Sequence, residues 1–184
     1  GEFVQLRSVL PYGDSILAYD FQQRRISIFT GAGKFTRSFE MPKFREGLWP
    51  HPVGTFRDGS ILVQSARQFM MGDSPHGVNR DASVLFRMSG TGEVLDSITA
   101  VAGAERYVRT VNLNGRLGFT VHALPFARAP HYVSRGDRVF VGASDEYAIH
   151  IFDKSGKLER TIRHTQPNRK VTRADVDRMK EARI

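Results

Sequence analysis

Residues 136–163 read GDRVFVGASDEYAIHIFDKSGKLERTIR, and apolar residues recur two positions apart in three parts of this stretch. These parts are Arg138 to Ala143, Tyr147 to Asp153 and Leu158 to Arg163, with a Lys-Ser-Gly-Lys turn before the last one. A period of two is typical of half-buried β-strands, because successive side chains of a strand point to opposite faces. The stretch therefore predicts three consecutive short strands.

The same pattern occurs earlier in the chain. Residues 13–39 read GDSILAYDFQQRRISIFTGAGKFTRSF and match the last copy position by position. The matched pairs are Ile16 with Val139, Phe29 with Phe152, Gly33 with Gly156 and Phe35 with Leu158. A middle copy is split between residues 58–65 and 83–98, where we match Phe86 to Phe29 and Gly92 to Gly33. Three copies predict a repeat architecture.

Glycine-containing turns divide each copy into four antiparallel strands. In the first copy we expect these strands at Gln5 to Leu10, Ser15 to Asp20, Arg25 to Phe29 and Phe35 to Phe39. Repeated four-stranded meanders are the sequence signature of propeller blades. The predicted fold is all-β, with three four-stranded antiparallel propeller blades. We place them at about residues 4–42, 51–98 and 131–163, within an arc of residues 1–165.

The run AYDFQQRRISIFTGAGKFTRSF, residues 18–39, resembles the NHL-type repeat of bacterial six-bladed propellers. The likeness lies in a strand that ends in Asp20, an Arg25-Ile26 pair, Phe29, a Gly turn and a further aromatic residue. It covers most of the chain and implies a six-bladed ring, of which the sequence contains half. An open arc would leave apolar sheet faces uncovered. Either the chain is part of a longer one or, as we expect, a homodimer completes the ring about a twofold axis.

Two insertions interrupt the repeat, at residues 66–82 and 99–130, and a meander places both at the same mouth of the channel. The shorter insertion is loop-like and carries Phe69, Met70, Met71 and His76. In the longer one, RTVNLNGRLGFTVHAL predicts a hairpin with Asn114-Gly115 at its tip. Long loops beside the opening of a scaffold commonly form ligand sites. The alternative is that they cover blade edges or an oligomer contact.

Two histidines begin the innermost strands of two copies. His51 opens HPVGTF in the middle copy and His131 opens HYVSRG in the last, whereas the first copy has Leu6 or Arg7 at this place. Because these strand starts lie at the channel mouth, we expect His51 and His131 to converge there as metal ligands. A twofold axis would gather four imidazoles, which suits a divalent metal ion, zinc more than calcium. The alternative is that each imidazole bonds to backbone or stacks on a neighbour.

Further candidate catalytic residues are His76, His122 and Arg128. The two histidines could reach the mouth as further ligands or as a general base, and Arg7, Arg109 or Arg128 could stabilise developing negative charge. The resemblance implies a metal-dependent hydrolase of esters, lactones or phosphotriesters, in which the metal lowers the pKa of bound water. The alternative is a non-catalytic propeller scaffold that binds a ligand or a protein, because such repeats do not determine chemistry.

Composition limits other classes of function. The formal charge is +8, but arginines such as Arg37, Arg87 and Arg160 are spread over alternate strand positions. We therefore expect solvated strand faces and no nucleic-acid partner. The absence of cysteine excludes disulfide and thiolate chemistry. No apolar run approaches about 20 residues, so we expect a soluble protein without a membrane partner, and a periplasmic or secreted location stays open.

The chain changes character at both ends. Gly1-Glu2-Phe3 is typical of a cloning remnant, so any native targeting segment would have been cut away. Residues 166–184 comprise a polar linker and a predicted helix with Thr172 as N-cap and Asp175 three residues on. A narrow apolar stripe of this helix is expected to lie across a blade or a partner subunit; it consists of Val176, Met179 and Ala182.

Overall fold

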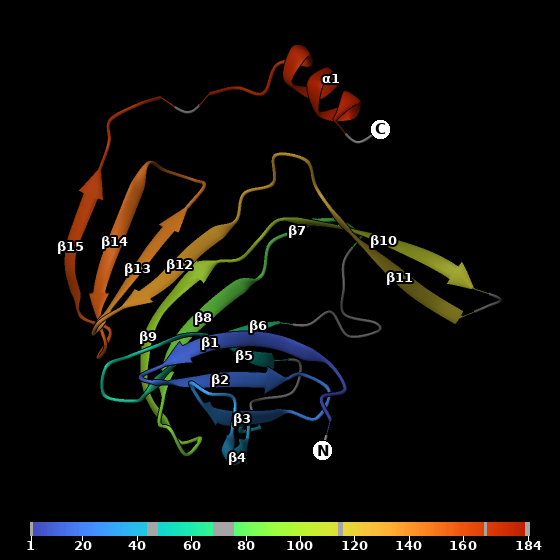
Figure 1. The fold of residues 1–184 in the computed structure, drawn as a ribbon. Helices are drawn as coiled ribbons and strands as arrows, with labels where there is room; N and C mark the ends of the chain where they lie inside the picture. Colours follow the sequence, from blue (N-terminus) through green and yellow to red (C-terminus); the bar gives the residue numbers. More distant parts are fainter. Residues whose placement is uncertain (1, 44–47, 68–75, 114–115, 168, 183–184) are drawn as a thin grey trace.

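The computed structural model describes residues 2–43, 48–67, 76–113, 116–167 and 169–182. Within these ranges the protein consists of antiparallel sheets and a C-terminal helix (Figure 1). Three of the sheets have four strands each in chain order, and a fourth sheet has three. The predicted all-β class and the four-stranded units are therefore confirmed for this part of the chain.

The strands of each sheet are as follows. Sheet 1 consists of β1 (Leu6–Tyr12), β2 (Ser15–Asp20), β3 (Arg25–Thr30) and β4 (Phe35–Glu40). Sheet 2 consists of β5 (Leu48–Thr55), β6 (Ile61–Arg67), β8 (Ala82–Met88) and β9 (Val94–Ala102). Sheet 3 consists of β12 (Pro130–Arg135), β13 (Arg138–Ala143), β14 (Ala148–Asp153) and β15 (Leu158–Arg163). The hairpin sheet consists of β11 (Arg116–Ala123), β10 (Arg106–Leu113) and β7 (Gly77–Asn79).

Sheets 1 and 3 share one register, as the sequence matches predict. In sheet 1, Ile16 pairs with Phe29 and Phe29 pairs with Phe35. In sheet 3 the same row is formed by Val139, Phe152 and Leu158. The register between the third and fourth strands also shifts at the same place, just before Phe29 and just before Phe152. The two copies are therefore structurally equivalent position by position.

Sheet 2 has the same register but corrects one match. Ile61 takes the place of Ile16 and pairs with Met88, which in turn pairs with Val94. Met88, and not Phe86, is thus the residue equivalent to Phe29, and the match to Phe86 is wrong. Phe86 and Met88 are two positions apart on the same face of β8, so the period of the pattern fits both.

Sheet 2 is buried on both faces because it lies between sheets 1 and 3. Ile61 belongs to a core cluster with Leu17 and Tyr19 of sheet 1, while Leu62 belongs to a second cluster with Val139 of sheet 3. Ile61 and Leu62 are both 0% exposed. Full burial of such a side chain stabilises a fold by about 1.5–3 kcal/mol. The two clusters therefore hold the three sheets in chain order.

The outward faces of sheets 1 and 3 are apolar and largely uncovered within the described chain, apart from Phe3, which packs on Phe29 of sheet 1. On sheet 3 the face opposite Val139 carries Val133 and Ile162, which are 58% and 51% exposed. On sheet 1 the face opposite Leu17 carries Val9 and Phe35, which are 57% and 55% exposed. The sheets form an open row, and these two faces lie at its two ends.

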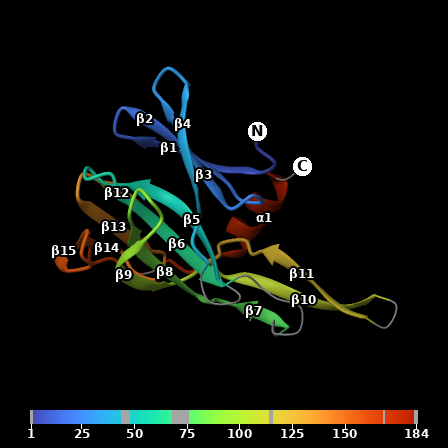
Figure 2. The same cartoon turned by 90° about the horizontal axis from the view of Figure 1, so that it is seen from below.

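The hairpin predicted in the longer insertion is present. β10 and β11 pair continuously from Arg106 with Ala123 to Leu113 with Arg116. Asn114 and Gly115, the predicted tip, lie outside the described residues. The hairpin projects away from the three large sheets (Figure 2). The shorter insertion is not wholly a loop, because its strand β7 pairs with the beginning of β10. The predicted lining residues Phe69, Met70 and Met71 lie outside the described part of the chain.

The C-terminal helix is α1 (Arg173–Glu181), and its predicted N-cap is confirmed. The Thr172 hydroxyl accepts a hydrogen bond from Asp175 N, and the Asp175 carboxylate accepts one from Thr172 N at 2.9 Å. Asp175 therefore completes a capping box although its side chain is shorter than that of Glu. No residue of α1 is buried, so its apolar stripe is not packed against a sheet of the same chain. No helix of the described residues is long and apolar enough to cross a bilayer.

One of the arginines expected on a solvated face is instead held in an ion-pair network of sheet 2. The Arg87 side chain is only 18% exposed and forms ion pairs with Asp58 at 3.1 Å and Asp96 at 2.6 Å. Lys154 of sheet 3 also binds Asp58, at 2.7 Å. Burial raises the pKa of Asp58, but hydrogen bonds from Lys154 and Ser60 prevail and hold it far below its ordinary value. Asp58 thus stays ionised between sheets 2 and 3.

Aspartates close the turns after two strands. The Asp20 carboxylate accepts hydrogen bonds from Val4 N at 2.6 Å and from Gln23 N at 2.9 Å. The Asp153 carboxylate likewise accepts them from Ser155 N and Lys157 N, both at 2.9 Å. Asp145, which follows β13, forms an ion pair with Arg80. These aspartates therefore have structural partners.

We predict that Gly54→Ala separates sheets 2 and 3. A Cβ at Gly54 would lie 2.1 Å from Ser134 Oγ, the atom that accepts a hydrogen bond from Thr55 N. Overpacking of this kind costs about 1–3 kcal/mol, which urea unfolding would measure. The cost should be smaller in a Ser134→Ala background, because that change removes the clashing oxygen. An equal cost in both backgrounds would contradict this packing.

Candidate functional site

A pocket of about 550 Å³ lies where the innermost strands of sheets 1, 2 and 3 begin. We call it the mouth pocket. It is lined by Gln5, Arg7, Phe21, Trp49, His51, Gln64, Asp81, Ser83, Gly103, Ala104, Arg106, Pro130 and Tyr132. Each of the three large sheets contributes residues, and both insertions do so as well, through Asp81 and through Gly103, Ala104 and Arg106. Sites for small molecules in proteins commonly have volumes of about 300–1,000 Å³.

One wall of the mouth pocket is aromatic. The rings of Phe21 and Trp49 lie 5.2 Å apart at an interplanar angle of 36°. The Arg7 guanidinium lies over the Phe21 ring, 5.4 Å from its centroid. The Tyr19 hydroxyl donates a hydrogen bond to the Pro50 carbonyl at 3.2 Å, which fixes β5 beside sheet 1. Arg7, Phe21 and Trp49 therefore form a stack that spans two sheets.

A polar floor lies between sheets 2 and 3. Gln64 Nε2 donates a hydrogen bond to Ser83 Oγ at 2.6 Å. Burial raises the pKa of the Tyr132 hydroxyl, and a hydrogen bond with the Ser83 side chain opposes this shift. Gln64 and Ser83 come from neighbouring strands of sheet 2, whereas Tyr132 comes from sheet 3. The floor therefore joins the two sheets directly beneath the pocket.

His51 is half-buried in this pocket and is neutral at neutral pH. Burial lowers the pKa of its imidazole, and the positive charge of Arg7 lowers it further. A hydrogen bond with the Trp49 backbone acts in the opposite direction. A neutral imidazole can accept a hydrogen bond or donate a nitrogen lone pair to a metal ion.

An ion-pair network fixes the two insertions around the pocket. Arg80 donates to both oxygens of Asp145, at 2.7 and 2.6 Å, and to the Gly103 carbonyl at 2.8 Å. Gly103 N donates to the Asp81 carbonyl, also at 2.8 Å. Hydrogen bonds from Arg80 hold the pKa of Asp145 below its ordinary value. The segments that carry Asp81, Gly103 and Arg106 are thus tied to sheet 3.

The structure does not bring His131 into the mouth pocket with His51. The two residues are equivalent, because His131 pairs with Gly142 as His51 pairs with Gln64. Each histidine lies on the face of its sheet that is directed toward the following sheet in the chain. His51 therefore faces sheet 3, whereas no sheet follows sheet 3 in the described chain. His131 is therefore exposed on the outward face. The equivalent residue of sheet 1 is Ser8, which pairs with Tyr19, and not Leu6 or Arg7.

His76 and His122 lie together on the hairpin sheet, outside the mouth pocket. His76 Nε2 is 3.2 Å from the Tyr107 hydroxyl, and the two rings meet edge to face. His122 is the cross-strand partner of Tyr107 on β11, and its Nε2 is 2.9 Å from Thr120 Oγ1. The structure therefore groups these two candidates around Tyr107 and does not group them with His51.

The candidate arginines have different surroundings. Arg128 is bound by two carboxylates, with its Nε 2.6 Å from Glu105 Oε1 and its NH1 3.2 Å from Asp145 Oδ1. Arg109 is exposed on β10 and does not line the mouth pocket. Arg7 is the candidate that lines the mouth pocket. The sequence did not single out Arg106, Trp49 or Tyr132, because these residues come from separate segments without a shared motif.

The described residues contain no group of three or more His, Asp or Glu side chains that could hold one metal ion. Within one chain, His51 therefore has no ready set of co-ligands in this part of the structure. Metal ligation by His51 and His131 stays a prediction, and it would need groups contributed from elsewhere.

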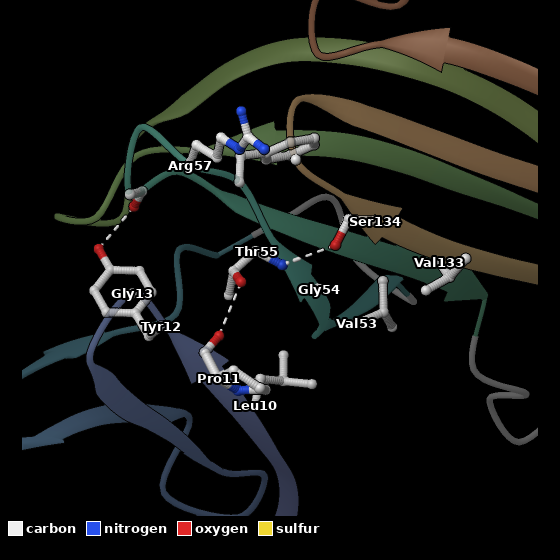
Figure 3. A pocket seen from close by; sticks show the side chains of 13 residues that line it. Leu10, Pro11, Tyr12, Gly13, Val53, Gly54, Thr55, Arg57, Val133 and Ser134 are labelled. Atoms are coloured by element: carbon white, nitrogen blue, oxygen red, sulfur yellow. Dashed lines mark hydrogen bonds between the residues drawn. The ribbon is translucent and has the colours of Figure 1, made fainter. Parts of the chain in front are cut away.

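A second cavity, of about 500 Å³, lies at the opposite ends of the same inner strands (Figure 3). Its polar groups are used to join the sheets. Thr55 Oγ1 donates to the Pro11 carbonyl at 2.8 Å, Thr55 N donates to Ser134 Oγ at 3.0 Å, and the Tyr12 hydroxyl donates to the Gly59 carbonyl at 2.7 Å. We call this cavity the turn-end cavity. Because its polar groups hydrogen-bond between sheets, they have a structural role.

Comparison of the chain with protein-family models and with curated proteins gives no match. The function is therefore interpreted from the site itself.

We predict that His51 makes the fold less stable in mild acid. Its folded pKa lies below the ordinary value of 6.5, so the unfolded chain binds this proton more tightly. This pKa difference does not change the unfolding free energy above about pH 7.5, where the imidazole is neutral in both states. It lowers the unfolding free energy as the pH falls through about 6.5, where the unfolded chain binds the proton. Between about pH 7.5 and about pH 5.5, wild type should lose more unfolding free energy in urea titrations than His51→Gln. Equal losses would contradict the burial of a neutral imidazole here.

Proposed function

We propose that this protein is a three-blade arc of a β-propeller that binds a small molecule in the mouth pocket, as a non-catalytic scaffold. Sheets 1, 2 and 3 are its blades. The shared register and the packing in chain order support this arrangement, because propeller blades are repeated four-stranded sheets that each pack on the next. The resemblance of residues 18–39 to NHL-type repeats agrees with it.

The observation that carries the proposal is the convergence of all three blades and both insertions on one pocket. Aromatic rings form one wall, and charged or polar side chains line the rest of the pocket; they are Gln5, Arg7, His51, Gln64, Asp81, Ser83 and Arg106. Sites for small molecules commonly combine apolar surface with placed polar groups that fix the orientation of the ligand. The turn-end cavity differs, because its polar groups are already bonded between sheets.

A screen of small molecules by thermal shift tests the proposal. Ligands of the mouth pocket should raise the unfolding temperature of wild type and of Arg57→Gln, whose side chain lines the turn-end cavity. They should bind His51→Trp at least about tenfold more weakly, because the larger ring fills the pocket; ten-fold corresponds to about 1.4 kcal/mol. Ligands that are lost with Arg57→Gln and kept with His51→Trp would contradict the proposed site.

Metal-dependent hydrolysis of esters, lactones or phosphotriesters stays a prediction from the family resemblance. Its test is elemental analysis of the purified protein, followed by ester and phosphotriester turnover before and after chelation. Stoichiometric metal, lost together with activity in His51→Ala and His131→Ala, would replace the scaffold proposal by the hydrolase. Metal-free protein without turnover is the result that the scaffold proposal predicts.

We further propose that a second copy of the chain completes a six-bladed ring. Within the chain, the Leu17 face of sheet 1 packs on the Ile61 face of sheet 2, and the Leu62 face of sheet 2 packs on the Val139 face of sheet 3. The uncovered face of sheet 3, which carries Phe140, is equivalent to the faces with Leu17 and Leu62. The uncovered face of sheet 1, which carries Ile16, is equivalent to the faces with Ile61 and Val139. The uncovered faces of two copies can therefore repeat the same junction. His131 would then line a pocket equivalent to that of His51.

Light scattering after size-exclusion chromatography tests this association. The ring predicts a mass twice the 20.7 kDa of the chain. Val133→Glu places a charge on the outward face of sheet 3 and should give monomers. Val78→Glu, at a similarly exposed residue on β7, is the matched control and should leave the dimer intact. A wild-type monomer, or equal effects of the two variants, would contradict the ring.

A further inference from the structure

We infer that the ligand of the mouth pocket is an organic anion with a flat apolar group, of which an aromatic carboxylate is the simplest example. The inference rests on the proposed function, because it names the chemistry of the molecule that the same pocket would bind.

The lining of the mouth pocket carries a net positive charge. Arg7 reaches the pocket from β1, and Arg106 reaches it from the beginning of β10. Among the described residues, neither guanidinium forms an ion pair, whereas those of Arg80, Arg87 and Arg128 are bound by carboxylates. Asp81 is the acidic residue of the lining, and His51 is neutral. Two arginines and one aspartate leave one net positive charge, which favours an anion.

One side of the mouth pocket suits a flat apolar group. The Phe21 and Trp49 rings form a wall of stacked aromatic surface at one side of the pocket, and Tyr132 contributes a third ring from sheet 3. A flat apolar group gains from contact with such rings in stacked or edge-to-face geometry. A cationic ligand could also stack on these rings, but it would meet Arg7, which already lies over Phe21.

The arginine charge and the aromatic wall lie next to each other. Because Arg7 lies over Phe21 and Phe21 contacts Trp49, the positive charge is next to the aromatic wall. A carboxylate attached directly to a ring can therefore bind a guanidinium while the ring contacts the wall. Arginine is suited to this task, since its planar group forms two parallel hydrogen bonds with a carboxylate. The Gln64 amide, held by Ser83, adds a polar group at the floor.

Three probes of the same size and different charge test the inference, with binding measured by NMR titration. They are benzoate, the neutral benzamide and the cationic benzamidinium. Benzoate should bind wild type at least about tenfold more tightly than either of the other two. Arg7→Gln and Arg106→Gln should each weaken benzoate about tenfold and leave benzamide unchanged. Arg57→Gln, which removes an arginine from the turn-end cavity, is the matched control and should bind benzoate as wild type does.

The contrary outcomes separate this inference from the proposed function. If benzamide or benzamidinium binds in the mouth pocket as tightly as benzoate, the anion preference is wrong and the pocket is still a ligand site. Benzoate binding that is unchanged in both Arg7→Gln and Arg106→Gln would also overturn the preference. If none of the three probes binds and the thermal-shift screen finds no ligand of any charge, both the inference and the proposed function are wrong. Unfolding midpoints close to that of wild type would show that the variants are folded.

Discussion

The structure depends on one strand that is buried on both of its faces. In β6, Ile61 and Leu62 are successive residues, and each is completely buried, one toward sheet 1 and the other toward sheet 3. A strand that alternates sides can satisfy both residues only if a sheet covers each face. Sheet 2 must therefore lie between its neighbours in the chain. Hydrogen bonds of Thr55 and the ion pair of Asp58 then fix the position of sheet 2 relative to sheets 1 and 3.

The mouth pocket follows from this arrangement. Three inner strands that begin at the same end leave a concave space between them, and the insertions of sheet 2 continue its walls. Because Arg80 joins Asp145 to the Gly103 carbonyl, these insertions are fixed to sheet 3. Rigid strands and fixed loops hold Arg7, His51 and Trp49 in place before a ligand arrives. Such preorganisation reduces the entropy lost on binding.

The sequence predicted the strands and turns well, because their signals are local. The alternation in residues 138–143 and the hairpin pattern of residues 109–124 depend only on neighbouring residues, and β13 and the paired strands β10 and β11 are found there. β7 could not be predicted, since three residues have no periodicity and this strand exists only by pairing with β10. The match of Phe86 to Phe29 failed for a similar reason, because only the cross-strand register selects Met88. The equivalence of His51 and His131 was correctly read. Their convergence is not seen within one chain and stays a prediction for a ring, since the sequence does not show which neighbour each face has.

Native-state hydrogen exchange of the β6 amides tests the central claim most directly. If sheet 2 lies between sheets 1 and 3, the amides of Leu62 and Val63 should exchange only through global unfolding. Their opening free energy should then equal that from urea titration and exceed that of the outermost strands β4 and β15. Exchange of β6 through local opening, at rates similar to those of β4, would show that sheet 2 is not enclosed and would contradict the account.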